Sequence, residues 1–206
     1  MNPKKMLKLT AGLLTCFGCA TPAFAQVTLS VDMDSITPGI QSTRSTLGPF
    51  TAGLIMTVGP GGVSSYGISV LFDNTELSLV GAPASTELLP AGFTFNFTPG
   101  VASESQALGN VLTFEAGTFG AGPSSTSFTF GTISYTVTSL VDDAVPDISL
   151  GFFNVGVDGL FDSAGFAVVP TFADGFVVAP VPEPGAGALL AGGMALTWLL
   201  TRRRSR

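Results

Sequence analysis

Histidine is absent from the chain, and its only two cysteines, Cys16 and Cys19, lie close to the N-terminus. The remainder of the chain therefore has neither imidazole nor thiol, which excludes serine–histidine triads, thiol catalysis and zinc sites built on His or Cys. The G-x-S-x-G pattern of a nucleophile elbow is missing as well. Without a disulfide, this part of the chain must rely on its hydrophobic core for stability.

Positive charge is scarce in the long section 26–180, whose only basic residue is Arg44. One basic residue against thirteen carboxylates gives this section a net charge of −12, compared with −6 for the whole chain. Nucleic acid is not expected as a partner, since binding its phosphates requires Lys and Arg. The carboxylates are those of Asp32, Asp34, Asp73, Glu76, Glu87, Glu104, Glu115, Asp142, Asp143, Asp147, Asp158, Asp162 and Asp174.

Aromatic residues suited to sugar stacking are also few. The single tryptophan, Trp198, lies near the C-terminus, and Tyr66 and Tyr135 occupy core-facing strand positions. Phenylalanine is abundant but alternates in the manner of core residues. Sugar-binding sites usually recruit exposed Trp or Tyr, so this pattern does not favour a lectin.

The N-terminus has the three parts of a secretory signal peptide. Lys4, Lys5 and Lys8 precede an apolar run, and the small residues Ala23 and Ala25 form an A-x-A cleavage site. We expect residues 1–25 to be removed, so that the mature chain begins at Gln26. A lipidated cysteine at position 16 is a minor alternative.

The C-terminus carries an uncharged segment, residues 185–201, followed by four arginines. A helix of these seventeen residues would span roughly 25 Å, slightly less than the hydrocarbon core of a bilayer. With the basic end 202–206 held in the cytoplasm, the positive-inside rule places the section between the two apolar segments outside. The alternative is a buried C-terminal helix of the soluble domain. The four basic residues are Arg202, Arg203, Arg204 and Arg206.

The motif ahead of this segment adds a family resemblance. Val181, Pro182, Glu183 and Pro184, then an apolar segment, then terminal arginines, resemble the PEP-CTERM sorting signal of exported bacterial proteins. The resemblance implies an exosortase as partner, a Gram-negative host that makes exopolysaccharide, and a precursor in the inner membrane that later reaches the cell surface or the exterior. Four glycines dilute the usual leucine-rich segment. They are Gly185, Gly187, Gly192 and Gly193.

Section 26–180 has the length of one domain, and its apolar residues follow the period of two that is typical of half-buried strands. Turn-rich stretches separate these strands, and no sustained helical repeat occurs. We therefore expect a single antiparallel β-sandwich. Strands are predicted at 27–34, 50–58, 66–72, 93–98, 110–119, 127–138, 147–154 and 174–178.

One predicted strand changes phase. Phe128 and Phe130 share one parity, whereas Ile133, Tyr135 and Val137 share the other. A β-bulge near the intervening Gly131 would place all five inside. A strand that is apolar on both faces is the alternative.

The middle of the chain also has a weaker resemblance, over residues 27–178. The stretches SYGISVLFDNTELSLVGA, LPAGFTFNF and FGTISYTVTSL resemble strands of cohesin-like, Ig-like or carbohydrate-binding-module-like sandwiches. This resemblance implies a β-sandwich and carries over no binding residue.

The carboxylates could serve in glycoside hydrolysis or in calcium binding. Glu104 and Glu115 flank a predicted hairpin and are the best candidates for the carboxylate pair that glycoside hydrolysis requires. Calcium takes clustered oxygen ligands, but no loop has EF-hand spacing, and solvated acidic loops are the simpler interpretation. The clusters are Asp32 with Asp34, Asp142 and Asp143 with Asp147, and Asp158 with Asp162.

These observations favour an exported, non-enzymatic protein of the cell envelope or extracellular matrix, without a required cofactor and associated with exopolysaccharide. The alternative is a surface protein that binds or cleaves polysaccharide.

Overall fold

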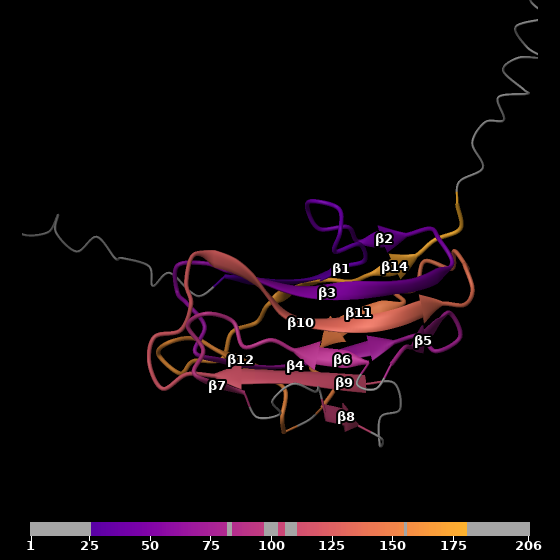
Figure 1. Cartoon of the computed structure of the whole chain (residues 1–206). Helices are drawn as coiled ribbons and strands as arrows, with labels where there is room; N and C mark the ends of the chain where they lie inside the picture. Colours follow the sequence, from indigo (N-terminus) through magenta and orange to yellow (C-terminus); the bar gives the residue numbers. More distant parts are fainter. Residues whose placement is uncertain (1–25, 82–83, 97–102, 106–110, 155, 181–206) are drawn as a thin grey trace, which may run out of the picture.

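The structure is a computed structural model that describes residues 26–81, 84–96, 103–105, 111–154 and 156–180. These residues form β-strands and turns, and the strands lie in two layers that face one another (Figure 1). The described residues contain no helix, and hence no helix that is long and apolar enough to cross a membrane. The predicted all-β sandwich is confirmed.

The first layer, the β3–β10 sheet, has the order β13–β1–β3–β10–β5, and β6 also pairs with β10. The second layer, the β4–β9 sheet, has the order β11–β4–β9–β7, with β12 on β4 and β8 on β9. The first sheet contains β1 (Val27–Asp32), β3 (Gly48–Val58), β5 (Leu77–Leu79), β6 (Ser85–Glu87), β10 (Thr126–Val137) and β13 (Thr171–Ala173). The second contains β4 (Ser65–Phe72), β7 (Phe95–Asn96), β8 (Ser103–Ser105), β9 (Val111–Gly117), β11 (Ile148–Gly151) and β12 (Gly159–Phe161).

Two strand pairs depart from the predicted antiparallel arrangement. Strand β13 runs parallel to β1, and β14 (Phe176–Val177) runs parallel to β2 (Thr43–Arg44) in a separate two-stranded sheet. After β12 in the second layer, the chain crosses to the first layer. There β13 pairs with β1 and runs in the same direction as β1. All other strand pairs described are antiparallel.

The core between the sheets is rich in aromatic rings. The ring of Phe130 on β10 lies 5.4 Å from that of Tyr66 on β4 and 6.0 Å from that of Phe114 on β9, centroid to centroid. Tyr66 and Tyr135 are buried, which confirms their predicted core-facing positions. Burial raises the pKa of both hydroxyls, and the nearby carboxylate of Glu87 adds to the effect at Tyr66.

The predicted β-bulge is present in β10. Thr129 pairs with Ile55 and Gly131 pairs with Leu54, so Phe130 is the extra residue on the bulged strand. Beyond the bulge, Ile133 resumes the inward alternation and is fully buried, as Phe130 is. The bulge interpretation is confirmed, and the alternative of a two-faced strand is wrong.

The predicted strand 93–98 is wrong in extent for the part that the structure describes. Only Phe95 and Asn96 form strand, as β7. Phe93 precedes the strand, because its N–H donates a 3.1 Å hydrogen bond to the carbonyl of Pro90 in a turn, and its ring enters the core.

Two buried carboxylates, those of Asp147 and Glu76, accept main-chain N–H groups at one end of the sandwich. Asp147 accepts a 2.6 Å hydrogen bond from the N–H of Val177 in β14, and Glu76 accepts one of 2.5 Å from the N–H of Val141. The Asp147 and Glu76 carboxyls are hydrogen bonded to each other. Burial, and then this hydrogen bond, raise the pKa of Asp147 to about 7, and the charges of Glu76 and Asp73 act in the same direction.

This pair predicts that stability falls as pH rises. The folded state holds a proton on Asp147 up to about pH 7, whereas an unfolded aspartate releases it near pH 4. Because the folded state binds more protons in that window, the free energy of unfolding decreases from about pH 4 to 7 and levels off above it. We expect Tm to fall by several degrees between pH 5 and 8 in calorimetry.

The matched variants are Asp147→Asn, which should flatten the dependence, and the exposed Asp142→Asn, which removes the same charge from the surface and should not. A Tm that stays constant or rises from pH 5 to 7 in the unmodified protein would contradict the prediction.

Candidate functional site

Polar and exposed aromatic side chains gather on the outer surface of the β4–β9 sheet. Side chains alternate along a strand, so positions between the core residues Tyr66 and Ile68 of β4, and on either side of Phe114 in β9, point away from the core. We call this surface the Glu115 face. It consists of Ser65, Gly67, Ser69, Phe95, Thr113, Glu115, Gly117, Phe119 and Phe161, together with the overlying loop residues 152–154 and 156–158.

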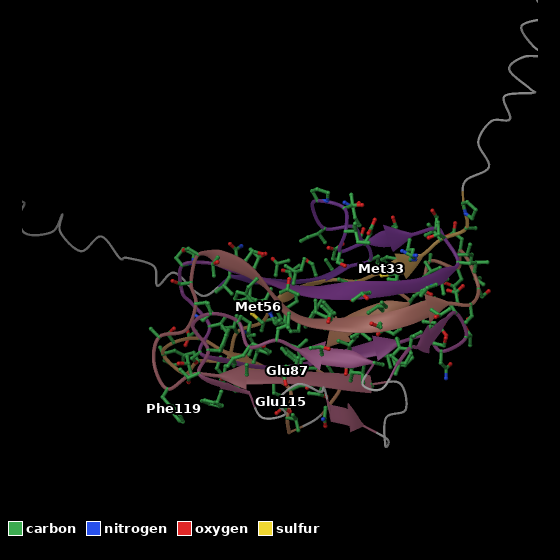
Figure 2. The ribbon with its side chains drawn as sticks, viewed as in Figure 1. Met33, Met56, Glu87, Glu115 and Phe119 are labelled. Atoms are coloured by element: carbon green, nitrogen blue, oxygen red, sulfur yellow. The ribbon has the colours of Figure 1, made fainter. Side chains whose placement is uncertain are left out.

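Aromatic rings line one end of the Glu115 face. Phe161, Ser65, Gly117 and Phe95 occupy one register row across strands β12, β4, β9 and β7. A Cβ at Gly117 would lie 2.7 Å from the Phe95 ring, so this ring rests on the glycine. Phe119 packs against Phe95 with centroids 4.9 Å apart and is 95% exposed (Figure 2). The row thus presents large apolar rings to solvent.

Beside this row, a glycine lets the loop at Val157 and Asp158 lie directly on β4. A Cβ at Gly67 would come within 2.5 Å of the carbonyl oxygen of Val157, so a larger residue would push the loop away. The loop, Phe161 and Glu115 border a hollow of about 190 Å³. The hollow opens next to the aromatic row.

A hydroxyl and carboxylate network continues the face beyond the hollow. Asp158 accepts a 2.9 Å hydrogen bond from Ser69 Oγ and one of 2.6 Å from the N–H of Asn154. The hydroxyls of Ser69 and Thr113 are 2.9 Å apart. Burial raises the pKa of Asp158, and burial followed by the charge of Asp158 raises the pKa of Glu115. Glu115 is therefore a carboxylate with increased proton affinity at the edge of the hollow.

The main chain at Glu115 is held by a residue of the opposite sheet. On β9, β7 pairs up to Ala116 and β8 pairs up to Thr113, which leaves position 115 between them. The buried Glu87 of β6 extends across the sandwich, and its Oε1 accepts the N–H of Glu115 (Figure 2). A carboxylate thus fills the gap between two short edge strands and links the two sheets.

The structure does not pair Glu104 with Glu115 as the sequence suggested. Strands β8 and β9 do form a hairpin, but Glu104 lies opposite Leu112, three residues from Glu115. At the strand rise of about 3.3 Å per residue, the two backbone positions are roughly 10 Å apart along the sheet. The acidic neighbour of Glu115 is instead Asp158, from a distant loop.

The first acidic cluster proposed for calcium holds a loop instead. Asp32 Oδ1 accepts the N–H groups of Asp34 and Gln41, at 3.2 and 3.0 Å, and closes the loop 33–41. Asp34 accepts the N–H of Ile36 at 3.2 Å and the hydroxyl of Thr37 at 2.6 Å. Among the described residues, no group of three or more Asp, Glu, His or Cys side chains is arranged to hold a metal ion. That the protein requires no cofactor stays a prediction, with calcium binding as its alternative.

Carboxylates accept main-chain N–H groups throughout the described domain. Of the twelve carboxylates whose side chains the structure describes, ten accept at least one main-chain N–H group, which satisfies turns and strand ends that lack a partner strand. Since basic residues are almost absent, these bonds provide the compensation that salt bridges provide elsewhere. The ten are Asp32, Asp34, Asp73, Glu76, Glu87, Asp143, Asp147, Asp158, Asp162 and Asp174.

No protein-family model matches the chain, and the curated proteins include no match. Solved structures that are similar to it are cohesin modules. A type III cohesin of the ScaE scaffoldin from Ruminococcus flavefaciens has a TM-score of 0.49 and 14% identity, over 76% of this chain and 89% of that one. The sixth cohesin of scaffoldin B from Acetivibrio cellulolyticus, solved in complex with a Cel5 dockerin mutant, has a TM-score of 0.48 and 16% identity, over 75% and 99%.

A non-cellulosomal cohesin from the archaeon Archaeoglobus fulgidus has a TM-score of 0.45 and 11% identity, over 79% of this chain and 96% of that one. Cohesins are one of the sandwich classes that the sequence resembles. At these identities and TM-scores the likeness assigns no function, and the chain's own strand order describes its fold.

The predicted sorting and cleavage residues lie outside the described residues. The structure therefore bears neither on the signal peptide 1–25 nor on the membrane helix 185–201. The same holds for the cleavage residues Ala23 and Ala25, the motif Val181, Pro182, Glu183 and Pro184, and the basic residues Arg202, Arg203, Arg204 and Arg206.

Sequence reasoning missed the aromatic part of the Glu115 face, because it assigned phenylalanine to the core. A signal was present. Phe119 shares its parity with the polar Thr113 and Glu115, and not with the buried Phe114. Period two, applied through the end of the predicted strand 110–119, would have placed Phe119 outside. Phe161 had no comparable signal, since its strand of three residues is too short to show a period.

Proposed function

We propose that the chain is an exported, non-enzymatic protein of the cell envelope or extracellular matrix, and that its sandwich binds exopolysaccharide through the Glu115 face. In this proposal the signal peptide 1–25 directs export, and the tail 181–206 delivers the precursor to an exosortase at the inner membrane. The PEP-CTERM resemblance supports the delivery route. The binding role rests on the structure of the described domain.

The exposed Phe119 ring, packed against Phe95 at one end of the Glu115 face, is the observation that carries the binding role. A sugar ring has an apolar face that suits an aromatic ring and hydroxyls that suit carboxylates. The Glu115 face offers both, since Phe161 and Glu115 line one hollow and Phe95 and Phe119 extend the apolar surface at one end. Because the face spans strands β12, β4, β9 and β7, it can contact several units of an extended chain.

A non-enzymatic role is supported by the way the carboxylates are used. Glycoside hydrolysis requires two carboxylates on opposite sides of the scissile bond. Glu115 lies at the hollow, but its acidic neighbour Asp158 is engaged by Ser69 and by the main chain of Asn154. This arrangement favours a fixed surface that holds its ligand.

The test is binding of exopolysaccharide from the native host. Phe119→Ser removes an exposed ring, which is worth about 1 kcal/mol, so we expect roughly fivefold weaker binding in calorimetry. Phe119→Ser with Phe161→Ser should weaken it further. The control is Leu47→Ser, since Leu47 is 60% exposed and directly precedes β3 in the opposite sheet.

Equal binding by Phe119→Ser and the unmodified protein would overturn the role of the face. Release of new reducing ends from the polysaccharide, abolished by Glu115→Gln, would identify an enzyme instead.

A further inference from the structure

A second hollow lies on the other side of the molecule, against the β3–β10 sheet. It has a volume of about 470 Å³ and is closed on one side by the loop 33–41. We call it the Arg44 pocket. Its lining includes Arg44 of β2, Phe50 and Thr51 of β3, Ser134 of β10, and Ser35 and Ile36 of the loop.

Arg44 is fixed in this pocket without a salt bridge to any described carboxylate. Its guanidinium carbon lies 4.6 Å from the centroid of the Phe50 ring, and its Nη2 donates a long 3.4 Å hydrogen bond to the carbonyl of Pro49. Its Nε is buried and has no hydrogen-bond partner in the part of the chain that the structure describes. The only cation of a section with a net charge of −12 is thus held by a ring and one weak bond.

The acid that lines the pocket with Arg44, Asp34, is committed to its own loop. Thr37 and the N–H of Ile36 hydrogen bond to its carboxylate. The hydroxyl of Thr37, followed by this N–H, lowers the pKa of Asp34, and Arg44 contributes least. Arg44 therefore keeps donors available for an anion that enters from solvent.

The other residues that line the pocket indicate which further groups such a ligand would carry. The hydroxyls of Thr51 and Ser134 are 3.4 Å apart and outside the core, and Ser35 Oγ donates to the carbonyl of Thr51 at 3.3 Å. Ile36, 92% exposed, and Val80 add apolar surface at the rim. Donors and acceptors of this kind match hydroxyl groups, and the apolar rim matches a ring face.

We propose that the Arg44 pocket binds a small hydroxylated acid of the size of one uronic acid unit, with its carboxylate on Arg44 and its hydroxyls toward Ser35, Thr51 and Ser134. The negative charge of the domain limits the site to ligands with a single anionic group, because a polyanion would be repelled by the surrounding carboxylates. This site is independent of the Glu115 face.

The test is calorimetric titration of the exported protein, purified untruncated in mild detergent, with D-glucuronate. We expect saturable binding that weakens with added salt, and at least about tenfold weaker binding of D-glucose, which has the same ring without the carboxylate. Arg44→Gln should weaken glucuronate binding by at least about tenfold while leaving exopolysaccharide binding at the Glu115 face unchanged.

Replacing Arg44 could disturb β2, of which it is part. A second pair of variants therefore tests the pocket without changing Arg44. Ile36→Asp places a negative charge at the exposed rim and should reduce glucuronate binding several-fold, whereas the neutral Ile36→Asn should reduce it less. No saturation by D-glucuronate at millimolar concentration, equal binding of D-glucose, or unchanged binding in Arg44→Gln would each overturn the proposal.

Discussion

Deletion of residues 181–206 sends the protein directly into the soluble exported fraction, whereas Glu183→Gln or Pro184→Ala leaves uncut precursor in the membrane. This result is expected if the tail is a sorting signal. From the sequence we expect Pro182 and Pro184 to favour extended backbone around them, which would present Glu183 to an enzyme at the membrane surface. The effect should be nearly complete, because recognition precedes cleavage.

Mass spectrometry of the C-terminal peptide provides the measurement. Mature protein from the native host should end near positions 182–184 and lack the arginines. Pro180→Ala, which changes a proline just ahead of the motif, is the matched control and should be processed normally. A plain membrane anchor predicts the opposite, since neither Glu183 nor Pro184 contributes much to insertion of a segment that begins at Gly185. An intact arginine-bearing end on surface protein would rule out processing.

Gly131→Val is expected to lower the stability of the sandwich by about 2–3 kcal/mol. At the bulge of β10, a Cβ at position 131 would overlap the ring of Phe114, with 2.6 Å to Cδ1, and would lie 3.3 Å from Leu54. Phe114 is fully buried against Phe130, so its ring has no free space to move into. In a domain of this size the change corresponds to a fall in Tm of roughly 5–10 °C.

The control for this variant is Gly120→Val. Gly120 lies in a loop, and a Cβ there would meet no atom within 4 Å. Its Tm should stay within about 2 °C of the unmodified protein, since surface changes away from packed features have small effects. If Gly131→Val were equally harmless, the bulge would not be packed as closely as the structure indicates.

The bulge also illustrates how much of the fold the sequence could predict. The parity change between Phe130 and Ile133 required an extra residue, and the glycine marked its position, so a local rule was sufficient. Long strands such as β3, β4 and β10 were predicted for the same reason. Strands of two or three residues, including β2, β12 and β13, are too short to show a period, and their existence depends on neighbours that are distant in the chain.

The candidate sites were less predictable, because they depend on contacts between remote segments. Nothing near Glu87 indicates that its carboxylate crosses to the N–H of Glu115, 28 residues later. Asp158 reaches Ser69 across 89 residues. Composition revealed that Arg44 is the sole cation of its section, but only the fold places it over Phe50 and against a hollow. The sequence therefore singled out individual residues of the candidate sites. It did not predict which residues of distant segments meet in the fold.

The single arginine of section 26–180 also bears on how the domain would meet proteases. Section 26–180 contains no lysine, so a protease of trypsin specificity has one bond to attack there, the bond after Arg44. That bond lies in β2, where Arg44 pairs with Val177 and its carbonyl accepts the N–H of Val178 at 2.8 Å. Cleavage requires an extended segment free of its neighbours, so β2 must first separate from β14. If the domain is exported as we propose, it should therefore resist proteases that cleave after lysine or arginine.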